Sequence, residues 1–297
     1  MQGPVPRPAY GLPMRLCLAH RSLDLTGPPA LMGIVNVTPD SFNDRGLTST
    51  AEAAVTRAGA MLAGGAAIVD IGGMTARPGM ELAAAEEIGR VDPVVRAVRD
   101  RYPDCLISVD TYRADVAVAA LAAGADLIND HTGLSDGDLA AAVAERRGGL
   151  VITHLGLRPK QAQEHRYTTT PAAIAAFLDE RAARAESAGV DGRALLVDPG
   201  LGFGKTTETD LETLRCLPDL LALGRPVLLA CSHKEVTAEP LGLPEESVEG
   251  TAAVVAVAAH LGVHVLRVHD LPFMERVARM GWLISARSRG EPTAERR

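Results

Sequence analysis

Eight short apolar runs recur along the chain, and an amphipathic stretch, often rich in alanine, follows each of them, as at 51–63, 113–123, 207–221 and 248–261. Runs that are apolar throughout indicate strands of a parallel sheet whose faces are covered by helices. Eight such units in about 250 residues are typical of a closed barrel. We therefore predict an α/β protein built as a single (β/α)8 TIM barrel. The eight runs lie at 31–36, 67–71, 105–109, 125–128, 149–153, 194–197, 226–230 and 264–268.

The ends of the chain differ in composition from this regular part. Residues 1–13 are rich in proline and glycine, which predicts a flexible lead. Residues 285–297 are charged and contain Gly290 and Pro292, which predicts a disordered tail. No low-complexity linker divides the chain between them. We expect one domain over residues 14–284.

Composition narrows the classes of partner. Hydrophobic residues make up 47% of the chain but aromatic residues only 3%, so small and branched aliphatic side chains must form the core. The net charge of −7 argues against a broad nucleic-acid surface, which needs clustered Lys and Arg. The four cysteines are far apart and form no CxxC pair, as expected for free thiols in a reducing cytosol. The chain has no signal-peptide pattern and no 18-residue apolar run, so we expect a cytoplasmic protein without a membrane span.

Every predicted strand ends in a side chain that can ionise or form hydrogen bonds. Parallel barrels build their active sites at these carboxyl ends. Asp and Asn also commonly cap the next helix, which is the alternative at any single position. All eight ends together favour a site. The residues are Asn36, Asp70, Asp110, Asn129 with Asp130, His154, Asp198, Ser232 to Lys234, and Arg267 with His269.

These strand-end residues divide by charge. Asp110, Asn129 and Asp198 offer acceptors and an amide, which suit the edge of a nitrogen-rich planar heterocycle. Lys234, Arg267 and His269 offer cationic donors, which suit phosphate oxygens or a polarised carbonyl. We predict that the late strands form an anion-binding side and the early strands a side that recognises hydrogen-bond donors.

Three loops add further candidates. Residues 36–46 are polar and include Phe42, which is typical of an active-site lid, although an ordinary connecting loop is the alternative. Residues 72–79 are glycine-rich and carry Arg77. Residues 200–206 look like the end of a nucleotide phosphate loop, but Pro199 stands where the GxxxxGKT spacing needs a glycine. The glycines of this loop are therefore expected to allow a tight turn.

In combination, these motifs make the chain similar to the dihydropteroate synthases from about Cys17 to Met280. Residues 33–42 resemble the first signature of the family, and residues 70–73 with 77–79 resemble the second. The later motifs follow in the family's order at 108–111, 128–130, 198–205 and 267–270. The family condenses 6-hydroxymethyl-7,8-dihydropterin diphosphate with p-aminobenzoate to give 7,8-dihydropteroate in folate biosynthesis. Diphosphate leaves the pterin methylene, and the amine of p-aminobenzoate attacks that carbon.

The resemblance implies a role for each matching residue. The expected pterin-binding residues are Asp110, Asn129, Asp198 and Lys234. Those expected to hold the diphosphate are Asn36, Arg267 and His269, with Asn36 also binding Mg2+, the implied cofactor. Phe42 and Asp44 belong to the loop that covers p-aminobenzoate, and Arg77 belongs to a second closing loop. The implied catalytic residues are Asp44, Asp110 and Lys234. Cations would stabilise the departing negative charge, and carboxylates the developing cationic pterin.

The chain departs from the family where p-aminobenzoate is expected to bind. The usual Ser-Arg-Lys-Ser is Ser232-His233-Lys234-Glu235, so a carboxylate replaces the serine that meets the carboxylate of p-aminobenzoate. His233 replaces an arginine and is neutral much of the time near pH 7. The usual Glu-Ser-Thr-Arg of the second loop is Met74 to Arg77. In these departures the chain is similar to the second, divergent synthase paralogue of some actinobacteria.

Three functions therefore compete. The first is an active dihydropteroate synthase. The second, favoured by Glu235, is a pterin-diphosphate-binding paralogue that lacks synthase activity or uses another acceptor. The third is a pterin-dependent methyltransferase of the same superfamily, which is disfavoured because methyltetrahydrofolate has no diphosphate to engage the cationic residues. The apolar last helices, at 248–261 and 272–284, are consistent with a homodimer, although plain barrel packing explains the same apolarity.

Overall fold

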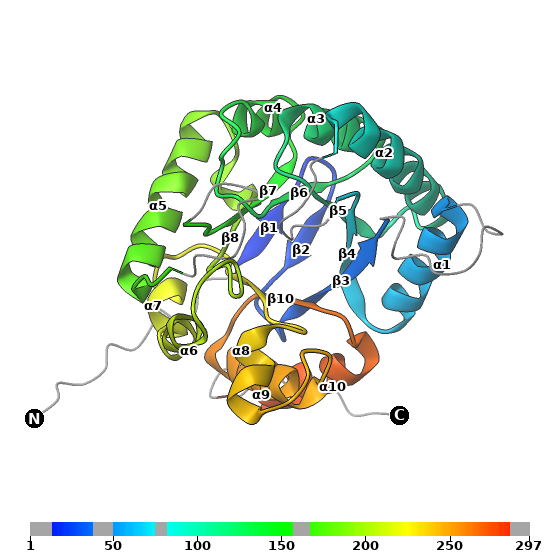
Figure 1. Ribbon diagram of the computed structural model, residues 1–297. Helices are drawn as coiled ribbons and strands as arrows, with labels where there is room; N and C mark the ends of the chain where they lie inside the picture. The colour runs from blue at the N-terminus through cyan, green and yellow to red at the C-terminus, as the bar shows by residue number, and fades with distance from the viewer. Residues whose placement is uncertain (1–13, 38–49, 75–81, 157–166, 286–297) are drawn as a thin grey trace, which may run out of the picture.

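The computed structural model describes residues 14–37, 50–74, 82–156 and 167–285, and in them the predicted barrel is confirmed (Figure 1). Eight parallel strands form one sheet in the order β8-β7-β6-β5-β4-β3-β10-β9. A parallel bridge between Val197 and Val227 joins β8 to the segment before β9 and closes the sheet. The strands are β3 (Ala30–Asn36), β4 (Ala66–Gly72), β5 (Leu106–Asp110), β6 (Leu127–Asp130), β7 (Gly149–Thr153), β8 (Leu195–Asp198), β9 (Leu228–Ala230) and β10 (Val265–Val268).

Helices surround the barrel. They are α1 (Thr50–Ala63), α2 (Ala84–Arg101), α3 (Ala114–Ala123), α4 (Leu139–Glu145), α5 (Pro171–Ser187), α6 (Thr207–Arg215), α7 (Leu217–Leu221), α8 (Glu235–Ala238), α9 (Val248–Leu261) and α10 (Leu271–Leu283), with 3-10 turns η2 (Gly192–Ala194) and η3 (Glu239–Leu241). The single helix predicted over 207–221 was wrong, because the chain breaks at Cys216 into α6 and α7. Pro218 lacks a backbone N–H and its ring crowds the preceding turn, so it starts a new helix instead of continuing α6.

Side chains alternate between two cores along each strand. In β4, Ile68 belongs to a buried cluster that draws on all eight barrel strands and on none of the described helices, so this cluster is the inside of the barrel. Its neighbour Val69 belongs to the larger cluster between the strands and the helices, which includes Val95 of α2. Because the period of a strand is two residues, every second side chain faces the barrel axis. This alternation decides which polar residues reach the site.

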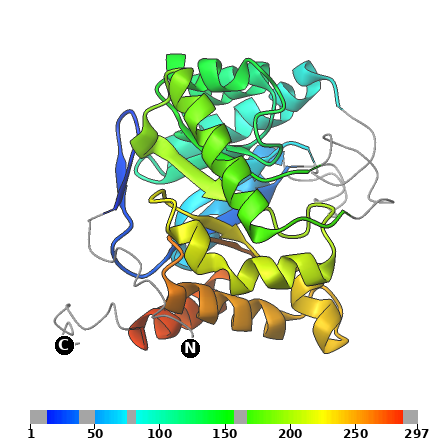
Figure 2. The ribbon, with the colours of Figure 1, turned by 90° about the vertical axis from the view of Figure 1, so that its left-hand side faces the viewer.

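A small hairpin covers the amino end of the barrel. Strands β1 (Arg15–Cys17) and β2 (Ser22–Asp24) pair antiparallel outside the main sheet. Leu16 and Leu25 are buried in the inner cluster against the first residues of the barrel strands. Figure 2 shows the hairpin (blue) beyond one end of the barrel. The hairpin fills the amino end with apolar side chains, which leaves polar groups to the carboxyl end.

The structure bears on the expectations for the chain ends, the cysteines and membrane spans. The flexible lead and the disordered tail lie outside the described residues, apart from Ser285, which is buried. All four cysteines are free thiols, as predicted. Among the described helices, none is long and apolar enough to cross a membrane.

Candidate active site at the carboxyl ends of the strands

Most of the predicted site residues occupy inward positions at the ends of the strands. In β4, Asp70 lies two residues after the inward Ile68, and in β5 Asp110 lies four after Leu106. The same spacing from inner-cluster residues brings the remaining side chains to the barrel axis. They are Asn36, Asn129, Asp198, Ser232, Arg267 and His269. The strand period therefore gathers them at one end of the barrel.

Two of the strand-end residues face outward instead. Asp130 is buried and accepts hydrogen bonds from the backbone and hydroxyl of Thr132 and from the backbone of Leu134, so it shapes its own turn. Burial raises the pKa of this carboxyl. His154 packs edge-on against Phe177 of α5, with ring centroids 4.8 Å apart. Burial, and then the charge of Lys205, lower the pKa of His154 to about 3. The expectation that every strand end contributes to the site is wrong for these two.

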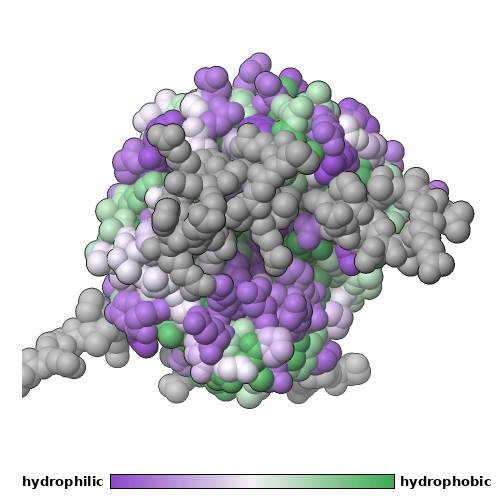
Figure 3. Space-filling view, viewed as in Figure 1, coloured by the Kyte–Doolittle hydropathy of each residue, from purple (hydrophilic) through white to green (hydrophobic). Residues whose placement is uncertain are grey.

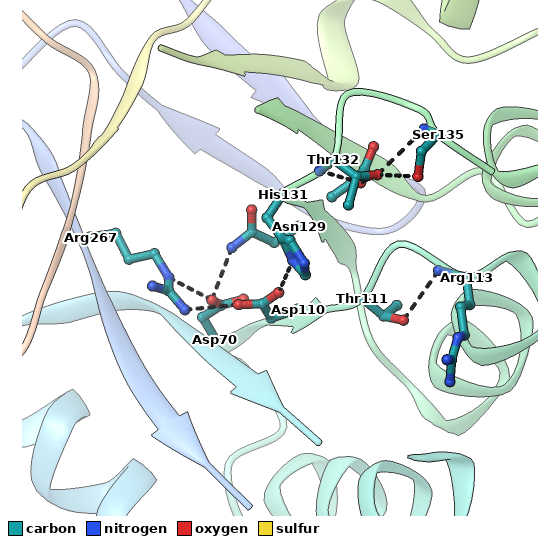
Figure 4. Close-up of polar contacts among 10 residues, drawn as sticks. Asp70, Asp110, Thr111, Arg113, Asn129, His131, Thr132, Ser135 and Arg267 are labelled. Atoms are coloured by element: carbon teal, nitrogen blue, oxygen red, sulfur yellow. Dashed lines mark hydrogen bonds and ion pairs between the residues drawn. The ribbon is translucent and has the colours of Figure 1, made fainter. Parts of the chain in front are cut away.

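Arg267 lies between two carboxylates of the early strands (Figure 4). Its Nε is 2.7 Å from Oδ2 of Asp70, and its Nη2 is 3.1 Å from Oδ2 of Asp110. Asn129 donates from Nδ2 to the same Asp70 oxygen at 3.0 Å. Burial opposes the charge of Arg267, but Asp70 and Asp110 outweigh it and raise the pKa of the guanidinium. The predicted anion-binding side and the carboxylate side therefore meet at Arg267, whose guanidinium is stabilised by the two carboxylates.

His131 is a further residue of this network, which the sequence interpretation missed. Its Nδ1 donates to Oδ1 of Asp110 at 2.8 Å, so the two oxygens of that carboxylate contact His131 and Arg267. The ring stacks on Phe203, with centroids 5.9 Å and planes 10° apart, and meets Tyr112 edge-on. Only 7% of the residue is exposed. Its position in the sequence, directly after Asn129 and Asp130 at the end of β6, is the feature that could have indicated a site residue.

Asp198 and Lys234 lie beside the glycine-rich loop that follows β8. Asp198 is 2% exposed and accepts a hydrogen bond from the backbone of Gly200 at 2.7 Å. Burial raises the pKa of Asp198, and the nearby charge of Lys234 opposes the rise. Lys234 donates from Nζ to the carbonyl of Leu201 and lies over the ring of Phe203. A carboxylate and an ammonium group thus lie near each other at the barrel mouth, beside this loop.

The glycines of this loop have the role that the sequence predicts. Gly200, Gly202 and Gly204 have φ values of +69°, +75° and +72°, which residues with a Cβ rarely adopt. At Gly202 a Cβ would also lie 3.1 Å from Cδ of Lys234. The glycines let the loop turn tightly beside that side chain.

Two histidines and an asparagine complete the described part of the site. His269 stacks on His233, with ring centroids 4.5 Å apart. Asn36, at the end of β3, has an exposed side chain. A Cβ built on Gly72 would touch both the amide oxygen of Asn36 and Asp110, so the glycine leaves space between them. In Figure 3, hydrophilic side chains gather in the lower middle of the barrel mouth.

Phe42, Asp44 and Arg77 lie outside the described residues. Glu235 is the first residue of α8 and is half-buried. Its charge adds to the effect of burial in raising the pKa of Asp210. The carboxylate of Glu235 therefore lies in the region that follows β9, where the sequence departs from the family.

Comparison with known proteins shows which family and which relatives the chain resembles. The model of the family described as pterin binding enzyme matches residues 32–269. A Mycobacterium tuberculosis protein named inactive dihydropteroate synthase 2 is 43% identical over 257 residues, which cover 84% of this chain and 81% of that protein. The dihydropteroate synthase of Streptococcus pyogenes serotype M1 is 40% identical over 252 residues, which cover 83% of this chain and 92% of that enzyme.

A solved structure is similar over almost the whole chain. It is Xanthomonas albilineans dihydropteroate synthase with 4-aminobenzoic acid, which has a TM-score of 0.85 and 39% sequence identity. The match covers 93% of this chain and 99% of that one. The similarity thus extends to fold and sequence together.

Proposed function

The chain belongs to the pterin-binding enzyme family, and we propose that it is a dihydropteroate synthase-type transferase. It would condense 6-hydroxymethyl-7,8-dihydropterin diphosphate with p-aminobenzoate to give 7,8-dihydropteroate and diphosphate. One observation carries the proposal: acceptors for a heterocycle and donors for an anion meet in one layer, where Arg267 touches Asp110 and Asp70. A substrate that is a pterin at one end and a diphosphate at the other matches this layer.

The pterin ring is assigned to the acceptor residues. Asp198 offers a buried carboxylate oxygen, and Asn129 offers an amide fixed by its bond to Asp70. Lys234 lies close enough to Asp198 for the two charges to influence each other. Buried acceptors of this kind select a ligand edge that carries N–H donors, because an unmatched buried polar group is costly. We assign Asp110 to the same edge, with His131 and Arg267 fixing the orientation of its carboxylate.

The diphosphate is assigned to Arg267, His269 and Asn36. A guanidinium has five N–H groups, so Arg267 can contact phosphate oxygens while it retains a contact to Asp70. Mg2+ commonly takes only one or two protein oxygens and completes its shell with phosphate and water. The space that Gly72 leaves beside the amide oxygen of Asn36 fits such a site. When bound, Mg2+ would supply positive charge to the leaving diphosphate.

The chemistry follows from where the charges lie. Loss of diphosphate puts negative charge near Arg267 and positive charge on the pterin methylene. The Asp110 and Asp198 carboxylates stabilise the developing positive charge, and the cationic residues stabilise the leaving group. Asp44 and Arg77 remain assigned to the closing loops by the family resemblance.

A pterin-diphosphate-binding protein without synthase activity is the second candidate. Glu235 and His233, together with the 43% identity to a protein named inactive, favour it. Calorimetric titration of pterin diphosphate and of p-aminobenzoate in separate experiments distinguishes the two. A synthase binds the pterin diphosphate. It also binds p-aminobenzoate, either alone or once the pterin site is filled. A binding paralogue binds the pterin diphosphate and no p-aminobenzoate. Loss of both supports neither function.

We also propose a homodimer through α9 and α10, in the cytoplasm. Apolar side chains on these helices are exposed, with Val257 54% and Met280 57% exposed. Exposed apolar patches of this kind commonly mark protein contacts. Sedimentation of the chain with Met280→Lys would show a monomer where the unaltered chain shows a dimer.

A further inference from the structure

Two histidine rings are stacked at the carboxyl ends of the neighbouring strands β9 and β10. His233 follows β9 and His269 follows β10, and their planes are within 8° of parallel. Nε2 of His233 is 3.0 Å from Oδ2 of Asp270, and Nδ1 of His269 is 3.0 Å from Oγ of Ser232. Each ring is thus fixed at one nitrogen by a neighbour, which holds the stack in place.

The backbone at His233 is unusual. Its φ is +55°, in the left-handed region that disfavours residues with a Cβ. The backbone N–H donates to Oγ1 of Thr251 at 3.4 Å. Strained backbone that persists at a site is a reason to look for a function. Here the residue with the left-handed backbone, His233, is the one whose ring stacks on His269.

The charges around the stack are mainly positive. Arg267 of β10 lies two residues before His269, Lys234 follows His233, and Asp270 is the carboxylate in contact with His233. Two protonated rings whose centroids are 4.5 Å apart would repel each other. Desolvation, followed by the charges of His233 and Arg267, lowers the pKa of His269 to about 4. Near neutral pH, His269 is therefore uncharged.

We propose that His233 and His269 form one anion-binding unit, which takes up a proton when the diphosphate end of the substrate binds. This inference rests on the proposed function of the site. An anion beside the stack stabilises a protonated ring, and a protonated ring stabilises the anion, so each favours the other by the same factor. His233 stands where the family has an arginine, so the unit has an imidazole in place of a permanently charged group. The unit then adds pH dependence to diphosphate affinity.

The test follows the histidine rings of the full chain by NMR. The ring signals are titrated with pH, with and without saturating inorganic diphosphate and Mg2+. His233→Gln and His269→Gln assign the two signals. We expect diphosphate to raise the pKa of His269 by about three units, a thousandfold change in proton affinity, so that the ring is protonated near neutral pH. His260, on the last turn of α9, serves as the internal control, and its titration should not change.

Affinity gives a second, independent readout. The dissociation constant of inorganic diphosphate is measured for the unaltered chain and for His269→Gln at pH 8 and pH 6. At each pH, the dissociation constant of His269→Gln is divided by that of the unaltered chain, which cancels the protonation of the ligand itself. We expect the ratio to change about tenfold in favour of the unaltered chain at pH 6, since one proton is linked to binding. In His233→Gln, the pKa of His269 should rise before ligand is added, because the repulsion between two protonated rings is removed.

Three results would overturn the inference. Diphosphate that binds without moving the titration of His269 would show that no proton is taken up. An unchanged His269 titration in His233→Gln would show that the rings do not act together. If diphosphate fails to bind at either pH, the proposed function of the site is wrong as well. The first two results leave that function intact.

Discussion

Nε of Arg267 donates to Oδ2 of Asp70 at 2.7 Å, although the two residues are 197 positions apart in the chain. The bond joins the last barrel strand to the second across β3. Asp70 is fully buried, and among the described residues only Arg267 forms an ion pair with its carboxylate. Arg267 therefore serves two purposes: it neutralises buried carboxylates, and it presents N–H groups to the barrel mouth.

Arg267→Ala should therefore lower both stability and diphosphate affinity. Removal of one partner from a buried ion pair commonly costs about 3–5 kcal/mol, because the other charge is left uncompensated. Urea unfolding measures this loss. In calorimetry, the affinity for the pterin diphosphate should fall much more than that for the bare pterin alcohol. Arg267→Lys is the matched control and should retain part of both. Equal losses for the two ligands would contradict the assignment of Arg267 to the diphosphate.

His131→Leu should weaken pterin binding about tenfold. The substitution removes the hydrogen bond to Oδ1 of Asp110, and a bond to a charged group is worth about 1.5–3 kcal/mol. His131→Asn keeps an N–H donor of smaller reach and should recover part of the affinity. Calorimetry with the pterin diphosphate provides the measurement. If His131→Leu binds as well as the unaltered chain, His131 does not position Asp110.

His154 predicts a loss of stability in acid. Its folded pKa, about 3, lies below the ordinary 6.5, so the unfolded chain binds the proton first as pH falls. Stability is full above pH 6.5 and declines between pH 6.5 and 3, by about 2 kcal/mol at pH 5. Urea unfolding at pH 7.5 and pH 5 measures the slope. His154→Leu should have a flatter slope than the unaltered chain, and an identical slope would contradict the effect of burial.

Much of this architecture was predictable because it follows from repetition. All eight strands lie within one or two residues of their predicted positions, since uninterrupted apolar runs mark strands buried on both sides. The hairpin was missed because β1 and β2 have three residues each, too few for a periodic signal. The break at Cys216 was missed because leucines recur on both sides of it, so the amphipathic pattern looks continuous around Pro218.

The site was predictable only in part, because position along a strand does not by itself give the direction of a side chain. Asp198 and Asp130 both end strands, yet Asp198 lies at an inward position and Asp130 caps its own turn. A shift of one residue reverses the face of a strand. The pairing of Arg267 with Asp70 depends on barrel closure, which the sequence indicates only as a fold class.

Glu235→Ser should raise activity with p-aminobenzoate, and more so together with His233→Arg. The family resemblance puts the carboxylate of p-aminobenzoate near this position. Two unit charges about 4 Å apart repel by about 4 kcal/mol at an effective dielectric constant near 20, a factor of several hundred in affinity. Steady-state assays of the single and double variants give KM for p-aminobenzoate. No gain over an already active unaltered chain would show that Glu235 does not oppose the acceptor.

The central claim is tested most directly by product formation. The unaltered chain is incubated with 6-hydroxymethyl-7,8-dihydropterin diphosphate, p-aminobenzoate and Mg2+, and both 7,8-dihydropteroate and released diphosphate are quantified over time. We expect the two products to appear in equal amounts, and Asp198→Ala, which loses a buried acceptor, to form at least tenfold less. A chain that binds the pterin diphosphate but forms no dihydropteroate at any p-aminobenzoate concentration would contradict the synthase assignment and support the binding paralogue.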